Sequence, residues 1–496
     1  MGLAFISWIL VLFVIDLLTI RWFPVPWIDE VMFADPAASL VLHGHWTSTA
    51  WYGRGDLTYW SGNVPAYSFL QVPWLWLFGV SGPAVRSLNS VLIACTMACT
   101  WFSVKRLNLI PTPSIRLVVL MALSLCYPVA YSVRCGRPDV VGMLLFAMSA
   151  LFWTTQRRSI GYTGLFCCAV LTPFSGIQYA FYMPILLGIV FWVCGKPAFG
   201  RLASIIGGGI LGAILLCIYY QSISGWDGLL SSAADVHGRR PPGIWDSFLT
   251  LLDTLVFRYY LGRPHFILLI CASILLAVKW KRLAWISKHR LVLAVMFLLG
   301  PGVSIGFFSH FGVPYHWLAV APALILLASV ASASWRDLGP ITQLCCGILA
   351  LGLATSGRLV LVAIGGILGS STYTERVEQA AAALVQPGEI IYGDWQIYYA
   401  MKPRAGRIYF SNLVPRLTEQ ERSAITMAFL PADRSDGPAW LSSTFGGHWT
   451  HKAMLPAPSP IPGSSKLIGS FSPGLFFGTR LSAYRRESNL QKAEFN

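Results

Sequence analysis

Two adjacent acids, Asp29 and Glu30, are the residues whose position best suits proton transfer. They come soon after the first long apolar run, at the point where the chain would leave a bilayer. A carboxylate at this boundary is partly desolvated, and desolvation raises its basicity. The alternative is that both acids are simply solvated in an aqueous loop. The pair is therefore a candidate general base. This interpretation is stronger if other acids and arginines lie on the same side of the membrane.

A third acid, Asp139, ends the segment RCGRPD at residues 134–139. It follows Pro138 at the start of another apolar run, so we expect it in the first turn of a helix. An acid at the positive end of a helix is also ordinary capping. Its expected place on the same membrane face as Asp29 makes it a candidate second catalytic carboxylate.

A long loop brings three basic side chains together, His237, Arg239 and Arg240, within ADVHGRRPPGIW at residues 234–245. Guanidinium groups bind phosphate through two parallel hydrogen bonds, so the loop is a candidate site for a phosphate or pyrophosphate. Arg258 stands beside the next apolar run and is a candidate for the same role. Contact with lipid headgroups is the alternative.

Three further candidates, His310, Tyr315 and His316, lie at the outer ends of two apolar runs. Tyrosine is expected at a membrane surface in any case, so the histidines are the more suggestive of the three. Two ionisable residues fall inside apolar runs, Asp16 and Arg358. For Asp16 we expect pairing with a neighbouring helix, and for Arg358 we expect a side chain that reaches the outer surface.

The composition indicates which elements must position these residues. The chain has 496 residues, 55% apolar and 11% charged, whereas soluble domains carry about 25% charged residues. This excludes a soluble globular enzyme and a disordered chain. Of the 57 charged residues, 23 lie in residues 373–496. The sequence therefore predicts a mainly α polytopic membrane domain at 1–372 and a small external α/β domain at 373–496.

Apolar runs long enough to cross about 30 Å of hydrocarbon predict the membrane spans. We count eleven of them, at residues 3–23, 84–104, 115–133, 138–155, 160–174, 177–194, 202–220, 264–279, 291–308, 315–333 and 341–364. The first is interpreted as a retained span, because it lacks the basic start and small-residue cleavage site of a signal peptide. The segment 64–80 contains two prolines and is interpreted as an amphipathic helix at the interface.

Charge placement sets the predicted orientation. The loops after the second, fourth, sixth, eighth and tenth runs hold 13 Lys and Arg residues and one acid, Asp337. By the positive-inside rule these loops are cytoplasmic, so the N-terminus is inside and residues 24–83, 221–263 and 373–496 are outside. The net charge of +15 thus sets orientation, and no nucleic-acid partner is expected. The eleven cysteines show neither a disulfide framework nor zinc-ligand spacing.

The order of these segments resembles the class C (GT-C) membrane glycosyltransferases, in the superfamily of protein mannosyltransferases and lipid A aminoarabinose transferases. The resemblance begins at Asp29-Glu30 and continues through VPAYSFLQVPWLWLFGVSGPAVRSLN, which matches that superfamily's interfacial helix and the Val-Arg that opens its second span. It includes Asp139 as the second acid and Tyr315-His316 before a late span, and it covers about residues 1–330. Two departures are Asn63, where the aminoarabinose transferases place Lys, and TPFSG at 172–176 in place of Lys-Gly.

The resemblance implies an integral-membrane glycosyltransferase, a hexosyl- or pentosyltransferase of a bacterial inner membrane. Its donor would be a polyprenyl-phosphate-linked sugar, and its acceptor a glycolipid, glycan or protein. The reaction would invert the anomeric centre, with Asp29 as base, Glu30 and Asp139 as orienting acids, and external arginines on the lipid phosphate. No cofactor is certain, and a divalent metal ion is compatible with the acids. A transporter or lipid flippase is the rival hypothesis, although it would place ionisable residues near the midplane. A non-catalytic assembly protein with the same fold is a third.

Overall fold

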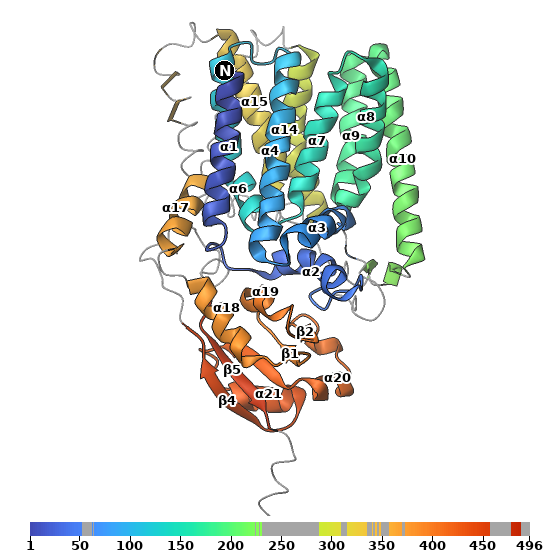
Figure 1. The fold of residues 1–496 in the computed structure, drawn as a ribbon. Coiled ribbons are helices and arrows are strands. Elements are labelled where there is room, and N and C mark those ends of the chain that lie inside the picture. Colours follow the sequence, from blue (N-terminus) through green and yellow to red (C-terminus); the bar gives the residue numbers. More distant parts are fainter. Residues whose placement is uncertain are drawn as a thin grey trace, which may run out of the picture.

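The helices of the chain form a bundle of roughly parallel rods, with the C-terminal strands packed below one end (Figure 1). The structure is a computed structural model that describes residues 1–51, 64–223, 287–308, 315–334, 357–369, 373–456 and 478–487, with a few isolated positions between them. Residues 1–369 are called the helical unit below, and residues 373–487 the C-terminal unit.

The rods of the helical unit are eleven helices of the described residues. They are α1 (Gly2–Thr19), α4 (Gly82–Arg106), α5 (Pro113–Leu125), α6 (Tyr127–Arg134), α7 (Asp139–Trp153), α8 (Arg158–Leu171), α9 (Ile177–Cys194), α10 (Phe199–Ser222), α14 (Lys288–Phe308), α15 (Trp317–Ser334) and α17 (Arg358–Gly369). Short 3-10 turns join some of them, η1 (Pro173–Ser175) and η2 (Lys196–Ala198).

Three segments of the described chain are long and apolar enough to cross a membrane, namely α1, α4 and Lys196–Ser222. The pair α5 and α6, bent by 48° at their junction, would make a fourth. The expected span at 264–279 and half of that at 341–364 lie outside the described residues. The structure therefore supports a membrane protein, and the count of eleven spans stays a prediction.

Two helices lie across the lower end of the bundle, α2 (Ile28–His43) and α3 (Pro65–Phe78) (Figure 1). At about 1.5 Å per residue, the 14 residues of α3 cannot cross about 30 Å of hydrocarbon. The helix buries Tyr67 and Leu75 and exposes Trp76 and Leu77. This two-sided burial agrees with the amphipathic interfacial helix predicted for this segment.

The C-terminal unit is a five-stranded mixed sheet with helices. The strands are β1 (Ile390–Tyr392), β2 (Arg407–Tyr409), β3 (Met427–Pro431), β4 (Trp449–Met454) and β5 (Leu481–Arg486). The sheet order is β2-β1-β3-β5-β4, with β1 parallel to β2 and β3, and β5 antiparallel to β3 and β4. The helices and turns are α18 (Tyr373–Leu384), η7 (Trp395–Ile397), α19 (Tyr398–Met401), η8 (Val414–Arg416), α20 (Glu419–Ala424) and α21 (Gly437–Phe445). The sequence predicted a small α/β domain for residues 373–496.

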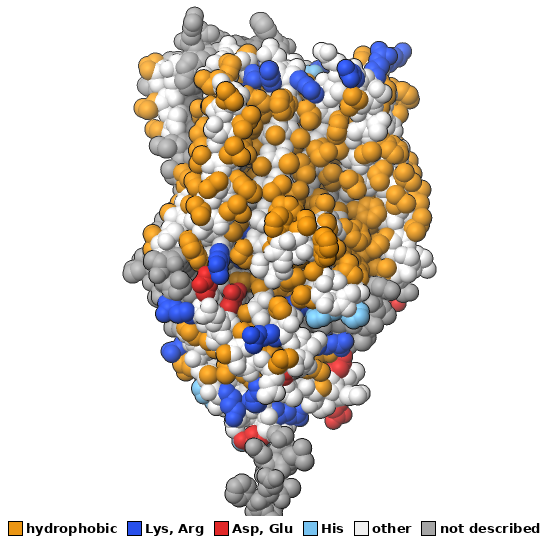
Figure 2. Space-filling view, in the orientation of Figure 1, with side chains coloured by type: hydrophobic (Ala, Val, Ile, Leu, Met, Phe, Trp, Pro, Cys, Tyr) orange, Lys and Arg blue, Asp and Glu red, His pale blue; other side chains and the backbone are white. Residues whose placement is uncertain are grey.

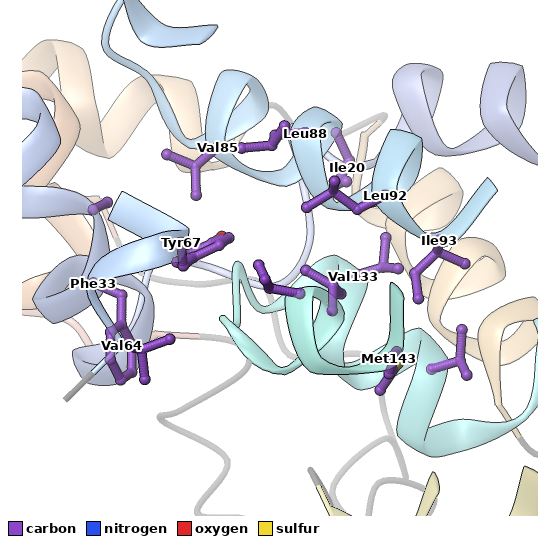
Figure 3. Packing of buried hydrophobic residues seen from close by; sticks show 14 of the residues in the cluster. Ile20, Phe33, Val64, Tyr67, Val85, Leu88, Leu92, Ile93, Val133 and Met143 are labelled. Atoms are coloured by element: carbon purple, nitrogen blue, oxygen red, sulfur yellow. The ribbon is translucent and has the colours of Figure 1, made fainter. Parts of the chain in front are cut away.

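A continuous apolar core joins the two units. One cluster of buried residues runs from Phe5 in α1 to Ala483 in β5. Figure 3 shows its centre, where Tyr67 of α3 faces Val85 of α4 and Val133 of α6. Continuous burial of this kind holds the C-terminal unit firmly against the end of the bundle.

Asp16 and Arg358, the two ionisable residues predicted inside apolar runs, form an ion pair inside the bundle. Asp16 of α1 is fully buried and receives Arg134 at 3.4 Å and Nε of Arg358 at 3.2 Å. The pairing expected for Asp16 is therefore confirmed. The expectation that Arg358 reaches the surface is wrong, because its side chain is 3% exposed and turned toward Asp16. The buried carboxylate of Asp16 needs a counter-charge, and the guanidinium group of Arg358 supplies it.

Candidate active site

The candidate site is built on the first turn of α2, which carries Asp29 and Glu30. Trp27 precedes the helix and donates from Nε1 to the carbonyl of Cys135 at 2.8 Å, which ties this turn to the segment before α7. Carboxylates are stabilised at a helix N-terminus by the helix dipole. Adjacent helical residues point about 100° apart, so the two acids meet different neighbours.

Asp29 and Asp139 share one cation, Arg137. Arg137 donates from Nε to Asp139 at 2.7 Å and from Nη1 to Asp29. The side chain of Asp29 is 27% exposed, whereas that of Asp139 is 3% exposed. The arginine therefore holds two carboxylates side by side, and Asp29 is the more exposed of the two.

The electrostatics at Asp29 favour a base. Burial raises the pKa of the Asp29 carboxyl, Arg137 opposes this, and the nearby charge of Asp139 raises it further; the net shift is upward. Tyr179 donates to Asp139 at 3.4 Å, and Tyr315 is near enough to interact electrostatically with the same three charged groups. A carboxylate with a raised pKa is a better proton acceptor at neutral pH than an ordinary aspartate.

Glu30 meets a different cation. Arg86 of α4 donates from Nε and Nη2 to the two oxygens of Glu30 at 3.0 and 2.7 Å, and its Nη1 donates to the carbonyls of Ile20 and Pro24. Tyr399 of α19 donates to Oε1 of Glu30 at 3.2 Å. The Glu30 side chain is 0% exposed. Both of its oxygens accept hydrogen bonds, so Glu30 connects α2 to α4 and to α19.

The segment that carries Arg137 is fixed by an asparagine of α4. Asn89 donates to the carbonyls of Ser132 and Arg137 at 2.8 and 3.0 Å. Its own carbonyl accepts from the hydroxyl of Tyr67, which also donates to the carbonyl of Gly136 at 2.9 Å. These hydrogen bonds fix the backbone around Arg137, so its side chain and the two carboxylates that it contacts are preorganised.

A third acid of α2, Asp35, connects this helix to the C-terminal unit. Lys402 lies 2.6 Å from Asp35, and Tyr398 of α19 donates to it at 2.6 Å. Ser48 and the backbone amides of residues 49–50 also donate to this carboxylate. Burial alone would raise the pKa of Asp35, but Lys402 and these donors hold it below its ordinary value. The C-terminal unit thus contributes directly to the position of α2.

A divalent ion would have to fit between Asp29 and Asp139. Arg137 already occupies the space between these carboxylates, and the described residues contain no group of three metal-ligating side chains. The residues that the structure describes here do not fit a metal ion, and the mechanism below uses none.

The structure brings together three of the residues predicted from the sequence, Asp29, Asp139 and Tyr315. Glu30 is adjacent in sequence but faces Arg86. His316 is buried at the start of α15, with 1% exposure. The other predicted binding residues and the departure at position 63 lie outside the described residues, namely Asn63, His237, Arg239, Arg240, Arg258 and His310.

Several residues of the site were not predicted as site residues, above all Arg137, Arg86 and Lys402. Arg137 had a signal, because it stands two residues before Asp139 in the segment already singled out. Arg86 appeared only as part of the resemblance. No sequence signal pointed to Lys402, because its partner Asp35 lies near the other end of the chain.

The fold resembles that of solved membrane glycosyltransferases. ArnT from Cupriavidus metallidurans bound to undecaprenyl phosphate matches with a TM-score of 0.53 at 13% identity, over 99% of this chain and 98% of ArnT. The arabinofuranosyltransferase AftD from Mycobacteria matches with 0.51 at 14% identity, over 97% of this chain and 40% of AftD. The oligosaccharyltransferase AglB from Archaeoglobus fulgidus, in complex with an inhibitory peptide and a dolichol-phosphate, matches with 0.50 at 10% identity, over 89% and 71%.

No family model matches the sequence, and no curated protein is significantly similar to it. The likeness to these three structures therefore concerns the fold. ArnT, AglB and AftD are GT-C glycosyltransferases, so the GT-C fold predicted from the sequence is confirmed.

Proposed function

We propose that this chain, which has the GT-C fold, is a membrane glycosyltransferase that moves a sugar from a polyprenyl-phosphate donor to an acceptor hydroxyl. The observation that carries the proposal is Asp29, a partly exposed carboxylate with a raised pKa, oriented by Arg137 at one end of a helical bundle. The class of donor is supported by the undecaprenyl phosphate and dolichol-phosphate in two structures of the same fold.

Asp29 acts as the general base. It takes the proton from the acceptor hydroxyl while that oxygen forms a bond to the anomeric carbon. The bond from the anomeric carbon to the phosphate oxygen breaks, and polyprenyl phosphate leaves with the electron pair. Attack opposite to the leaving group inverts the anomeric configuration. Asp139 contributes through Arg137, whose charge it shares with Asp29.

The leaving phosphate needs positive charge near the anomeric carbon. Arg137 is the cation in direct contact with Asp29 among the described residues. His237, Arg239, Arg240 and Arg258 stay the predicted contacts to the donor phosphate, from the loop singled out in the sequence.

The site is proposed to face the outside of the cell. Lys and Arg side chains gather at the end of the bundle remote from the C-terminal unit (Figure 2). The predicted cytoplasmic residues Lys105, Arg106 and Arg158 begin or end helices at that end. This sidedness supports a donor carried by a lipid, since nucleotide sugars are scarce outside the cytoplasm.

The substitution Asp29→Asn tests the proposal, because it keeps the shape and removes the proton acceptor. Release of polyprenyl phosphate from polyprenyl-phosphate sugars should fall about 10²–10⁴-fold, with expression and donor binding retained. Asp227→Asn, at an exposed acid after α10, is the matched control and should turn over normally. Normal turnover by Asp29→Asn would refute the assignment of the base.

Glu30→Gln separates the roles of the two adjacent acids. We expect it to lower thermal stability, because it leaves Arg86 buried without its counter-charge. A stable Glu30→Gln protein without turnover, beside an active Asp29→Asn protein, would exchange their roles.

A further inference from the structure

A cavity with charged residues in its lining lies between the two units. Its volume is about 360 Å³, and it is enclosed by the outer end of α1, the start of α4 and the helices α18 and α19. The charged residues that line it are Arg21, Arg86, Glu375 and Glu378. Asp29 is not part of this lining, and its carboxylate instead accepts from Arg137.

Three of the four charges, those of Arg86, Arg21 and Glu375, already have partners within the protein. Arg86 is committed to Glu30 and to backbone carbonyls. Arg21 pairs through Nε with Glu375 at 2.8 Å, but its side chain is 60% exposed. Its terminal nitrogens are therefore accessible to a ligand from outside.

Glu378 is the unbalanced charge of the cavity. It lies one helical turn after Glu375 on α18 and has no hydrogen bond or ion pair with the residues that the structure describes. Burial raises the pKa of its carboxyl to about 7, although Arg21 and Arg86 act in the opposite direction. A carboxylate destabilised in this way gains from any cation that enters the cavity.

The start of α4 does not make the cavity a simple anion site. Ser81 caps this helix by accepting from the amide of Ala84 at 3.2 Å, and Pro83 has no amide hydrogen to offer. The backbone therefore presents few free donors, and the lining includes two acids. A ligand that is only an anion fits this combination poorly.

The apolar side chains near the cavity lead us to expect it at the level of the lipid headgroups. Helices that border it carry apolar side chains on their outer faces, Leu17 and Leu18 at the end of α1 and Trp76 and Leu77 at the end of α3, all 45% exposed or more. Figure 2 shows basic and acidic side chains side by side just below this apolar band. A lipid beside α1 would thus place its headgroup at the cavity mouth.

We propose that the cavity binds the headgroup of a zwitterionic phospholipid that carries a primary amine. The ammonium group donates to Glu378, and the phosphate binds the exposed face of Arg21. A trimethylated ammonium group, as in choline, has no N–H to donate, and a headgroup without an amine leaves Glu378 without a counter-charge. The site is separate from the proposed active site and would link α1 and α4 of the helical unit to α18 of the C-terminal unit.

The test measures which lipid stays bound to the full chain. The purified protein is equilibrated with phosphatidylethanolamine, phosphatidylcholine and phosphatidylglycerol of identical acyl chains, and retained lipid is identified by native mass spectrometry. We expect retention of phosphatidylethanolamine to exceed the other two about tenfold, as for one charged hydrogen bond. Glu378→Gln should abolish this preference, and Asp433→Asn, at an exposed acid far from the cavity, should keep it.

A second measurement on the unmodified protein removes the dependence on a variant that folds. Soluble O-phosphoethanolamine should displace the retained lipid, and phosphocholine at the same concentration should not. Equal retention of the three lipids, or an unchanged preference in folded Glu378→Gln, would overturn the proposal. Neither readout requires turnover, so the outcome is independent of the proposed function.

Discussion

The substitution Lys402→Met tests whether the C-terminal unit holds the helix that carries the proposed base. Lys402 lies 2.6 Å from Asp35 and donates to Ser39 at 2.8 Å, and the two charged side chains are 9% and 0% exposed. Methionine preserves most of the length of the apolar stem and removes the charge. The buried Asp35 then loses its counter-ion.

Removing one partner of a buried ion pair costs about 3–5 kcal/mol of folding free energy. Tyr398 and Ser48 continue to donate to Asp35 at 2.6 and 2.7 Å, so part of its solvation survives. We therefore expect a loss of about 3 kcal/mol, at the lower end of this range. The double variant Asp35→Asn with Lys402→Met should recover most of the loss, because it leaves no charge unpaired.

The pH dependence follows from the sign of the shift. The pKa of Asp35 is below its ordinary value in the folded protein. Its contribution to stability is present above the ordinary pKa of an aspartate and is lost as the pH falls through the lowered value. Without Lys402 the pKa of Asp35 should rise, and the stability of the variant should improve on mild acidification while that of the unmodified protein does not.

Unfolding of the purified protein in detergent, followed by heat or by denaturant, measures this difference. Lys452→Met is the matched control, because Lys452 is exposed on β4. A loss below about 1 kcal/mol for Lys402→Met, the range of a surface ion pair, would refute the interpretation that this pair is a buried contact between the units. So would a double variant that is less stable than the single one.

Three further predictions concern other parts of the molecule. Glu378→Gln should stabilise the protein at pH 8. The pKa of the Glu378 carboxyl is raised from 4.5 to about 7 in the folded protein, so this group makes the protein less stable as the pH rises through that interval. Unfolding curves at pH 5 and 8 should differ less for the variant than for the unmodified protein. Gly136→Ala should cost about 1–3 kcal/mol of folding free energy, because φ is +58° and a Cβ would lie 2.6 Å from the Glu30 side chain. Gly388→Ala, where φ is +78° and the surrounding space is open, should cost only about 1 kcal/mol. Equal melting temperatures for the two variants would contradict this. A reporter active only in the cytoplasm and fused after Asn496 should be silent, and strong activity would reverse the predicted topology.

Local sequence signals were sufficient for the elements that carry the site. Pro138 followed by Asp139 predicted the start of α7, and the structure begins that helix at Asp139. The prolines within residues 64–80 predicted an interfacial helix, and α3 is too short to span a membrane. The small α/β domain predicted for residues 373–496 followed from the higher density of charged residues there. Each of these signals depends on neighbours in sequence, which is why it could be detected without the fold.

The pairing of charges could not be predicted in the same way. Arg358 was expected at the surface, and it pairs instead with Asp16. An isolated charge near the end of an apolar run is compatible with both outcomes, because the choice depends on whether another helix brings a carboxylate within reach. That information is not present in either local sequence.

The different surroundings of the adjacent acids Asp29 and Glu30 could not be predicted from the sequence either. In the structure they pair with different arginines, Arg137 and Arg86. Helix α2 carries three carboxylates, and each has a partner on a different element: Asp29 on the segment before α7, Glu30 on α4 and Asp35 beside α19. Three ion pairs in three directions fix both the rotation and the position of this helix. Glu30 and Asp35 have no exposed surface, whereas Asp29 keeps 27%. Since a general base must reach the proton that it removes, this difference in exposure supports the proposal that Asp29 is the base among the three acids of α2.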